Sequence, residues 1–132
     1  GFTLGLQLDP DVQPVKGDAI EIEQVLFNLV RNAMDAVAAA NLRQIVITTR
    51  AAGAVTVLEV TDSGPGVPSA IRPRLFEPFV TGKPDGTGLG LALCQRLVDS
   101  MGGNIALDDT AERTTFRVSL PTFSQDAREA AE

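Results

Sequence analysis

The sequence predicts an α/β fold of the α+β type, in which a mixed, mostly antiparallel sheet of about five strands packs on about three helices. Strand-like and helix-like segments are interspersed without a regular β-α-β repeat, which favours a two-layer sandwich over a doubly wound sheet. The chain of 132 residues is long enough for one domain with a hydrophobic core. We expect residues 1–121 to form that domain and residues 122–132 to form a frayed tail or a stub of helix.

The expected strands are short segments of alternating or β-branched apolar residues. They comprise residues 3–8, 45–49, 55–61, 104–107 and 115–120. The second and third are predicted to form a hairpin that turns at Ala52-Gly53, and Pro121 follows the last strand. These segments supply the whole of the predicted sheet.

Three helices are expected, over residues 19–39, 68–76 and 91–101. Asp18 followed by Glu21 is typical of an N-cap with an acidic first turn, so the longest helix should begin at residue 19. Gly102-Gly103 should end the third helix, since glycine commonly follows a helix C-terminus.

The longest helix carries an unusual polar stripe. At 100° per residue its apolar residues fall on one broad face, while Gln24, Asn28, Asn32 and Asp35 fall on another. Such a stripe is often only a solvated face, but solvated faces favour Lys, Glu and Arg, and Asn is a poor helix former. The side-chain oxygens of two Asn residues four apart lie on adjacent turns and are suitable ligands for Mg²⁺.

Three alternate glycines, in residues 86–91 (GTGLGL), stand directly before the third helix. Without β-carbons the backbone amides can approach a ligand closely, and the first turn of a helix offers unpaired N–H groups. The run therefore fits an anion such as polyphosphate. Glycines also serve tight turns, so this run alone leaves the turn-only interpretation open.

Asp62 follows the alternating strand and enters a glycine-rich bend, residues 62–66 (DSGPG). An Asp before Gly commonly caps a turn. The alternative is that its carboxylate accepts a hydrogen bond from an exocyclic amine such as that of adenine, while Gly64 and Gly66 leave room for a flat ring. Taken alone, the bend favours the turn-capping interpretation.

Four segments, in this order, resemble the motifs of one family. Residues 23–33 (EQVLFNLVRNA) resemble its N box, residues 62–66 its first glycine box, residues 75–79 (LFEPF) its F box, and residues 86–91 its second glycine box. The family is the catalytic and ATP-binding domain of bacterial sensor histidine kinases, within the GHKL superfamily that also holds gyrase-type and heat-shock chaperone ATPases. The resemblance covers nearly the whole chain and implies the same two-layer ATP-binding fold.

The resemblance assigns roles to the residues that match the motifs. Asn32 would hold Mg²⁺, and Asn28 would sit beside the metal and the phosphates of ATP. Asp62 would bind the adenine amino group, and Gly64 and Gly66 would line the base pocket.

The second glycine box would bind phosphates through backbone amides. Its members are Gly86, Thr87, Gly88, Leu89 and Gly90. Lys83 matches the lysine that reaches the terminal phosphate in relatives with a short lid, although a solvated loop lysine is the simpler alternative. Residues 79–88, rich in Gly, Pro and Thr, are expected to be a mobile lid. Thr114 receives no role, because the glycine-bearing turn that often precedes this position in the family is missing.

Composition excludes several other functions. With a net charge of −6, the chain is not expected to bind nucleic acid through a general basic surface. It has no apolar run near the roughly 20 residues needed to span a bilayer, so we expect a cytoplasmic domain, whose parent could itself be membrane-anchored. The single Cys94 fits a buried apolar site in a reducing compartment, and the lack of His excludes the usual structural zinc sites.

The activity follows from two absences. The chain contains no histidine, so the phosphate acceptor of a histidine kinase must lie on another segment, normally a dimerising hairpin. The related ATPases have a Glu one turn before the metal-binding Asn, where this chain has Asn28, and an amide is no general base. We therefore expect a protein histidine kinase that is incomplete without its histidine-bearing domain, rather than a hydrolase.

The implied partners are that dimerisation domain and, through it, a response regulator. The parent is expected to be a homodimer and the isolated domain a monomer. Two alternatives remain: a protein serine kinase of the anti-sigma-factor type, which shares the motifs, and a nucleotide-sensing scaffold without transfer activity.

Overall fold

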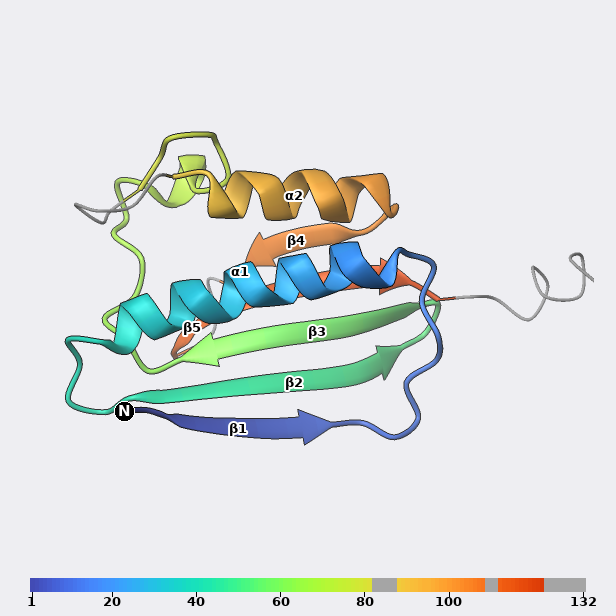
Figure 1. The fold of residues 1–132 in the computed structure, drawn as a ribbon, viewed down its shortest axis with the longest axis horizontal. Helices are drawn as coiled ribbons and strands as arrows, with labels where there is room; N and C mark the ends of the chain where they lie inside the picture. Colours follow the sequence, from blue (N-terminus) through green and yellow to red (C-terminus); the bar gives the residue numbers. More distant parts are fainter. Residues whose placement is uncertain (82–87, 109–111, 123–132) are drawn as a thin grey trace, which may run out of the picture.

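A computed structural model describes residues 1–81, 88–108 and 112–122. Within these residues, one five-stranded sheet is covered by two α-helices and a 3-10 turn, which confirms the predicted α/β sandwich (Figure 1). In chain order the elements are β1 (Thr3–Leu8), α1 (Ala19–Val37), β2 (Gln44–Ala52), β3 (Val55–Asp62), η1 (Arg72–Arg74), α2 (Gly90–Ser100), β4 (Asn104–Leu107) and β5 (Thr114–Pro121). The predicted tail from residue 123 onward lies outside the described residues.

The sheet is mixed, with the strand order β1-β2-β3-β5-β4. Only the β1–β2 pair is parallel, and the other three pairs are antiparallel. The predicted hairpin is confirmed, but Ala52 pairs with Val55, so the turn is Gly53-Ala54, one residue later than expected. Gly53 adopts a φ of +65°, which is the left-handed region that two-residue hairpins require.

Helix α1 begins where the sequence predicts. Asp18 is its N-cap, and the Asp18 Oδ1 atom accepts hydrogen bonds from the amides of Ile20 at 2.8 Å and Glu21 at 3.2 Å. The helix ends at Val37, two residues before the predicted end. Helix α2 begins at Gly90, so the last glycine of the second glycine box is already its first helical residue.

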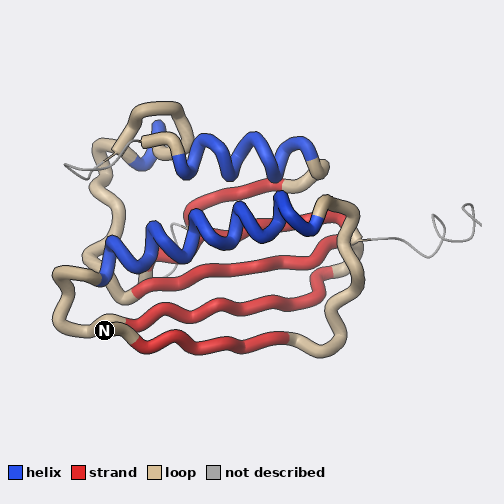
Figure 2. The backbone as a smooth tube through the Cα atoms, viewed as in Figure 1, coloured by secondary structure: helices blue, strands red, loops and turns tan. Residues whose placement is uncertain are grey.

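The short helix predicted over residues 68–76 is wrong in kind and extent. Only Arg72–Arg74 form a single 3-10 turn (Figure 2). Pro73 has no amide hydrogen to donate and restricts the residue before it, so a regular α-helix cannot run through this segment.

Both helices pack on the same face of the sheet. Val60 pairs in register with Ile47 on one side and Phe116 on the other, so their side chains share this face and enter the core. Leu29 of α1 and Val98 of α2 are fully buried against them. At the edge strand β1 no helix overlies the sheet in Figure 1, and its leucines are exposed.

The opposite face of the sheet is polar. Glu59 pairs with Arg50 at 3.2 Å and with Arg117 at 3.3 Å, and Arg117 also contacts Asp108 at 2.6 Å. Hydrogen bonding to Asp108 raises the pKa of Arg117 further, so the guanidinium stays charged. The helix-covered face is therefore where an enclosed site can form.

Truncation of the core should be costly. Leu29→Ala removes a side chain with no exposed surface and should lower the free energy of unfolding by about 2 to 5 kcal/mol. Leu42→Ala is the matched control, because Leu42 is 49% exposed and its loss should change stability by less than about 0.5 kcal/mol. Urea denaturation followed by circular dichroism measures both, and equal losses would contradict the assigned core.

Candidate functional site

A cavity of about 490 Å³ opens between α1, the loop after β3, the start of α2 and the first residues of β5. Its described lining is Asn28, Arg31, Asn32, Asp35, Ala36, Asp62, Pro65, Gly66, Val67, Pro68, Ile71, Leu75, Val80, Thr81, Gly88, Gly90, Leu91, Thr114 and Phe116. Six of the predicted site residues therefore line one cavity: Asn28, Asn32, Asp62, Gly66, Gly88 and Gly90. Three others, Lys83, Gly86 and Thr87, lie outside the described residues.

Asp62 is positioned by the alternation of β3. It lies two residues after Val60, so its side chain is on the helix-covered face, and only 2% of the residue is exposed. Its Oδ1 atom accepts a hydrogen bond from the Gly64 amide at 2.9 Å. The Asp62 carboxylate therefore caps the turn and also lines the cavity.

The two glycines of the bend have different surroundings. Gly64 does not line the cavity but lies against the end of α1, where an added Cβ would be 2.7 Å from the carbonyl oxygen of Ala36. Gly66 lines the cavity with a φ of +90°, and an added Cβ there would be 3.8 Å from the hydroxyl of Thr114. Glycine at these positions lets the loop bend tightly and pack on the helix.

Thr114 is a lining residue that received no role from the sequence. It is paired with Asp62 in the β3–β5 register, so the two side chains are cross-strand neighbours on the same face. Because the family's glycine-bearing turn is missing here, the motifs did not identify Thr114. The strand register identifies it: Phe116 pairs with Val60, so Thr114, two residues earlier, pairs with Asp62.

Asn28 and Asn32 line the wall of the cavity that α1 provides. Asn28 is also close to α2, because its Oδ1 atom lies 3.7 Å from the place a Cβ of Gly90 would occupy. Three of the four residues of the predicted polar stripe thus line the cavity, and Gln24 is not among the lining residues. Asp35 and Arg31, from the same side of α1, line it as well.

The first turn of α2 lines the cavity at Gly90 and Leu91, and Gly88, which precedes the N-cap, lines it as well. Its N-cap residue is Leu89, whose side chain has no oxygen to accept from the first helical amides, and no acidic residue stands in the first turn. Amides of this kind, together with the positive end of the helix dipole, favour an anion. Leu89 itself is not among the lining residues.

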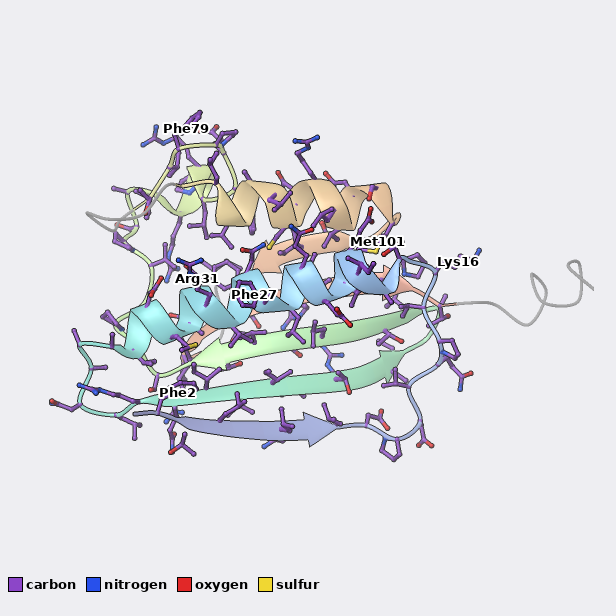
Figure 3. The ribbon with its side chains drawn as sticks, in the orientation of Figure 1. Phe2, Lys16, Phe27, Arg31, Phe79 and Met101 are labelled. Atoms are coloured by element: carbon purple, nitrogen blue, oxygen red, sulfur yellow. The ribbon has the colours of Figure 1, made fainter. Side chains whose placement is uncertain are left out.

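The two end residues of the predicted lid, Phe79 and Gly88, contact each other, whereas residues 82–87 lie outside the described residues. The Phe79 amide donates to the Gly88 carbonyl at 2.9 Å, and both residues have positive φ values, +69° and +72°. An added Cβ on Gly88 would be 2.4 Å from the Phe79 carbonyl carbon, so only glycine fits there. Figure 3 shows Phe79 on the outer loop, pointing away from the sheet, and it is 75% exposed.

Cys94 of α2 is buried behind the cavity. Its Sγ donates to the carbonyl of Val25 at 3.7 Å, which links the two helices. Burial raises the pKa of the Cys94 thiol to about 11, although a hydrogen bond from the Asn28 amide lowers it in part. The expected buried apolar role of this cysteine is confirmed.

The family model described as "Histidine kinase-, DNA gyrase B-, and HSP90-like ATPase" matches residues 17–124. The chain belongs to this family, which confirms the resemblance drawn from the motifs.

Among curated proteins, the C4-dicarboxylate transport sensor protein DctB of Rhizobium meliloti (strain 1021) is 40% identical over 115 residues, covering 87% of this chain and 18% of that protein. The sensory histidine kinase/phosphatase NtrB of Rhizobium leguminosarum bv. phaseoli is 39% identical, covering 96% and 38%. The chain thus spans well under half the length of these relatives.

The fold is shared with solved structures. The nucleotide-free catalytic domain of histidine kinase ThkA superposes with a TM-score of 0.80 at 32% identity, covering 92% of this chain and 79% of that one. ThkA in complex with the response regulator protein TrrA matches with a TM-score of 0.72 at 29% identity, covering 90% and 34%. Among the described residues, no helix has both the length and the apolar character needed to cross a membrane.

The raised pKa of Cys94 predicts slow chemistry at this thiol. At pH 8 the folded protein should react with iodoacetamide far more slowly than the urea-unfolded chain, because the thiolate is the reacting form. As the pH rises, the thiol of the unfolded chain ionises before the thiol of the folded protein. The contribution of Cys94 to the free energy of unfolding should therefore be fully present below about pH 8.5 and should be lost as the pH rises toward 11. Cys94→Ala should remove that part of the alkaline loss in denaturation curves, and equal labelling of folded and unfolded protein would contradict the burial.

Proposed function

We propose that this chain is the ATP-binding catalytic domain of a sensor histidine kinase. It would position Mg-ATP for transfer of the γ-phosphoryl group to a histidine on a separate dimerisation and phosphoacceptor domain. The observation that carries the proposal is a single cavity with a buried carboxylate at one end, two Asn side chains along one wall and the start of a helix at the other end.

The Asp62 end of the cavity suits adenine. The carboxylate can accept a hydrogen bond from the exocyclic amine, and the Thr114 hydroxyl lies beside it in the strand register. Val67, Ile71 and Leu75 give this cavity an apolar lining for a flat ring. Guanine presents a carbonyl where adenine presents an amine, so the same carboxylate would repel it.

The other end suits polyphosphate and a hard cation. Gly88 and Gly90 leave the amides near the α2 N-terminus accessible, and the amide oxygens of Asn28 and Asn32 belong to the ligand type that Mg²⁺ accepts. Asn32 would hold the metal, with Asn28 beside it. Mg²⁺ supplies neutralisation of charge on the β- and γ-phosphates. Lys83 would reach the terminal phosphate from outside the described residues.

The acceptor of the phosphate has to come from elsewhere. The 132 residues contain no histidine, and phosphoryl transfer needs an in-line nucleophile. The partners would be the histidine-bearing dimerisation domain of the parent and, through it, a response regulator. The solved complex of ThkA with TrrA and the sensor proteins among the relatives support this assignment. The parent would be a homodimer, and this domain a cytoplasmic monomer.

Hydrolysis is disfavoured by the residue types on α1. Asn28 occupies the cavity wall one turn before Asn32, where a carboxylate would be needed to orient and deprotonate water. The cavity should therefore hold ATP without transferring its phosphate to solvent.

Nucleotide binding tests the adenine assignment. ATP should bind with a dissociation constant between micromolar and millimolar, roughly −8 to −4 kcal/mol. Asp62→Asn should weaken ATP binding about 10- to 100-fold, because a donor then faces the amine and a bond to a charged group is lost. Asp99→Asn, at an exposed position of α2, is the control and should change nothing. Isothermal calorimetry measures these affinities, and GTP binding as tightly as ATP would contradict the role of Asp62.

Phosphoryl transfer tests the activity. Incubated alone with γ-labelled ATP, the domain should neither label itself nor release appreciable phosphate. With the histidine-bearing hairpin of its parent it should give an acid-labile, alkali-stable phosphorylated hairpin, and Asn32→Ala should abolish the transfer by loosening the metal. Robust phosphate release by the domain alone would indicate an ATPase. An acid-stable product would indicate a serine kinase, and binding without any transfer would indicate a scaffold.

A further inference from the structure

Arg31 is the only cationic side chain among the described residues that line the cavity. It is an exposed residue of α1, between Asn28 and Asn32 in sequence, and it received no role from the motifs. Figure 3 shows it on the side of α1 that faces the loop before α2. The described lining also carries two carboxylates, Asp35 and Asp62. Arg31 therefore supplies the one positive side-chain charge of this described lining that a polyphosphate could meet, and it offsets one of the two carboxylates.

The guanidinium of Arg31 has no protein partner among the described residues. Its side chain makes no hydrogen bond or ion pair within that part of the chain. Other arginines of the described chain do have partners. Arg50 forms an ion pair with Glu59, and Arg113 donates a hydrogen bond to Gln44. An arginine that lines a cavity without a partner is available to an anionic ligand.

Its place along α1 indicates which part of the nucleotide it can reach. The adenine end of the cavity lies where Gly64 contacts Ala36 at the end of the helix, and the α2 end lies where Asn28 approaches Gly90. Arg31 follows Asn28 by three residues and precedes Ala36 by five, so it stands one turn from the α2 end. Guanidinium groups bind phosphate through two parallel N–H bonds, which suits this position.

We propose that Arg31 is a phosphate-binding residue of this site, which contacts the polyphosphate of ATP from the α1 wall, opposite the amides of the α2 N-terminus. The proposal rests on the proposed nucleotide function and deepens it. It adds a cation from helix α1 to a site whose expected cation, Lys83, lies outside the described residues. Because the side chain is exposed, its contribution should be modest and sensitive to salt.

The test compares Arg31→Gln with Arg96→Gln, which makes the same change in net charge at an exposed position of α2 outside the cavity. Gln is a good helix former, so both variants should fold, which circular dichroism verifies. By calorimetry, Arg31→Gln should weaken Mg-ATP binding about three- to tenfold. Adenosine, measured by competition, should bind both proteins equally, and Arg96→Gln should bind Mg-ATP like the wild type.

Ionic strength gives a second readout. Raising NaCl should weaken Mg-ATP binding more for the wild type than for Arg31→Gln, because one charge contact has been removed. Arg31→Lys should bind between the two, since it keeps the charge and loses the planar fork. If Arg31→Gln binds Mg-ATP like the wild type, or if Arg96→Gln loses as much affinity, the role of Arg31 is overturned. If the wild type itself does not bind Mg-ATP, the proposed function fails instead.

Discussion

The position of a buried carboxylate at the edge of the core is the constraint on which the candidate site depends. Asp62 continues the helix-facing row of β3 beyond Val60, where an apolar residue would be expected, and it is 2% exposed. A polar group in such a place has to be hydrogen-bonded. The amide of Gly64 provides one bond, and the absence of a Cβ on that glycine lets the loop rest on the carbonyl of Ala36. One interaction thereby ties the end of β3 to the end of α1 and fixes one end of the cavity.

Helix α1 serves the core and the cavity with different faces. Val25 and Leu29 are buried in the core, while Asn28 and Asn32 line the cavity. The same helix contacts α2 through Val25 and Cys94, so the α2 N-terminus is held beside Asn28. Packing of the two helices therefore sets the distance between the amide side chains and the helix amides.

Much of this fold could be predicted from local patterns. The strands follow from alternation, and α1 follows from its 3.6-residue periodicity and the Asp18 cap, because these signals depend on neighbours in the chain. The Asn stripe and Asp62 were found because their residue types are costly or unusual where they stand. The hairpin turn lies one residue later than predicted, because Gly53 can occupy either the first or the second position of a two-residue turn and the structure places it first.

The remaining features depend on contacts between distant segments. Thr114 enters the cavity only through its register with Asp62, and Gly64 is required by the approach of its loop to α1. Arg31 is indistinguishable in sequence from a solvated helix residue until the cavity is seen beside it. The segment of residues 68–76 was predicted as a helix, but Pro73 has no amide hydrogen to donate, and only a 3-10 turn forms there.

The central claim is that one cavity between α1 and α2 receives the whole nucleotide. A ¹⁵N-resolved NMR titration with Mg-ATP tests it most directly, because every amide reports its own surroundings. The account predicts the largest shift changes at Asp62, Gly64 and Gly66 for the base, and at Asn28, Asn32 and Gly90 for the phosphates. Titration with adenosine should move the first group and leave the second largely in place. Shift changes concentrated on β1, or on the polar face around Glu59 and Arg117, would contradict the account.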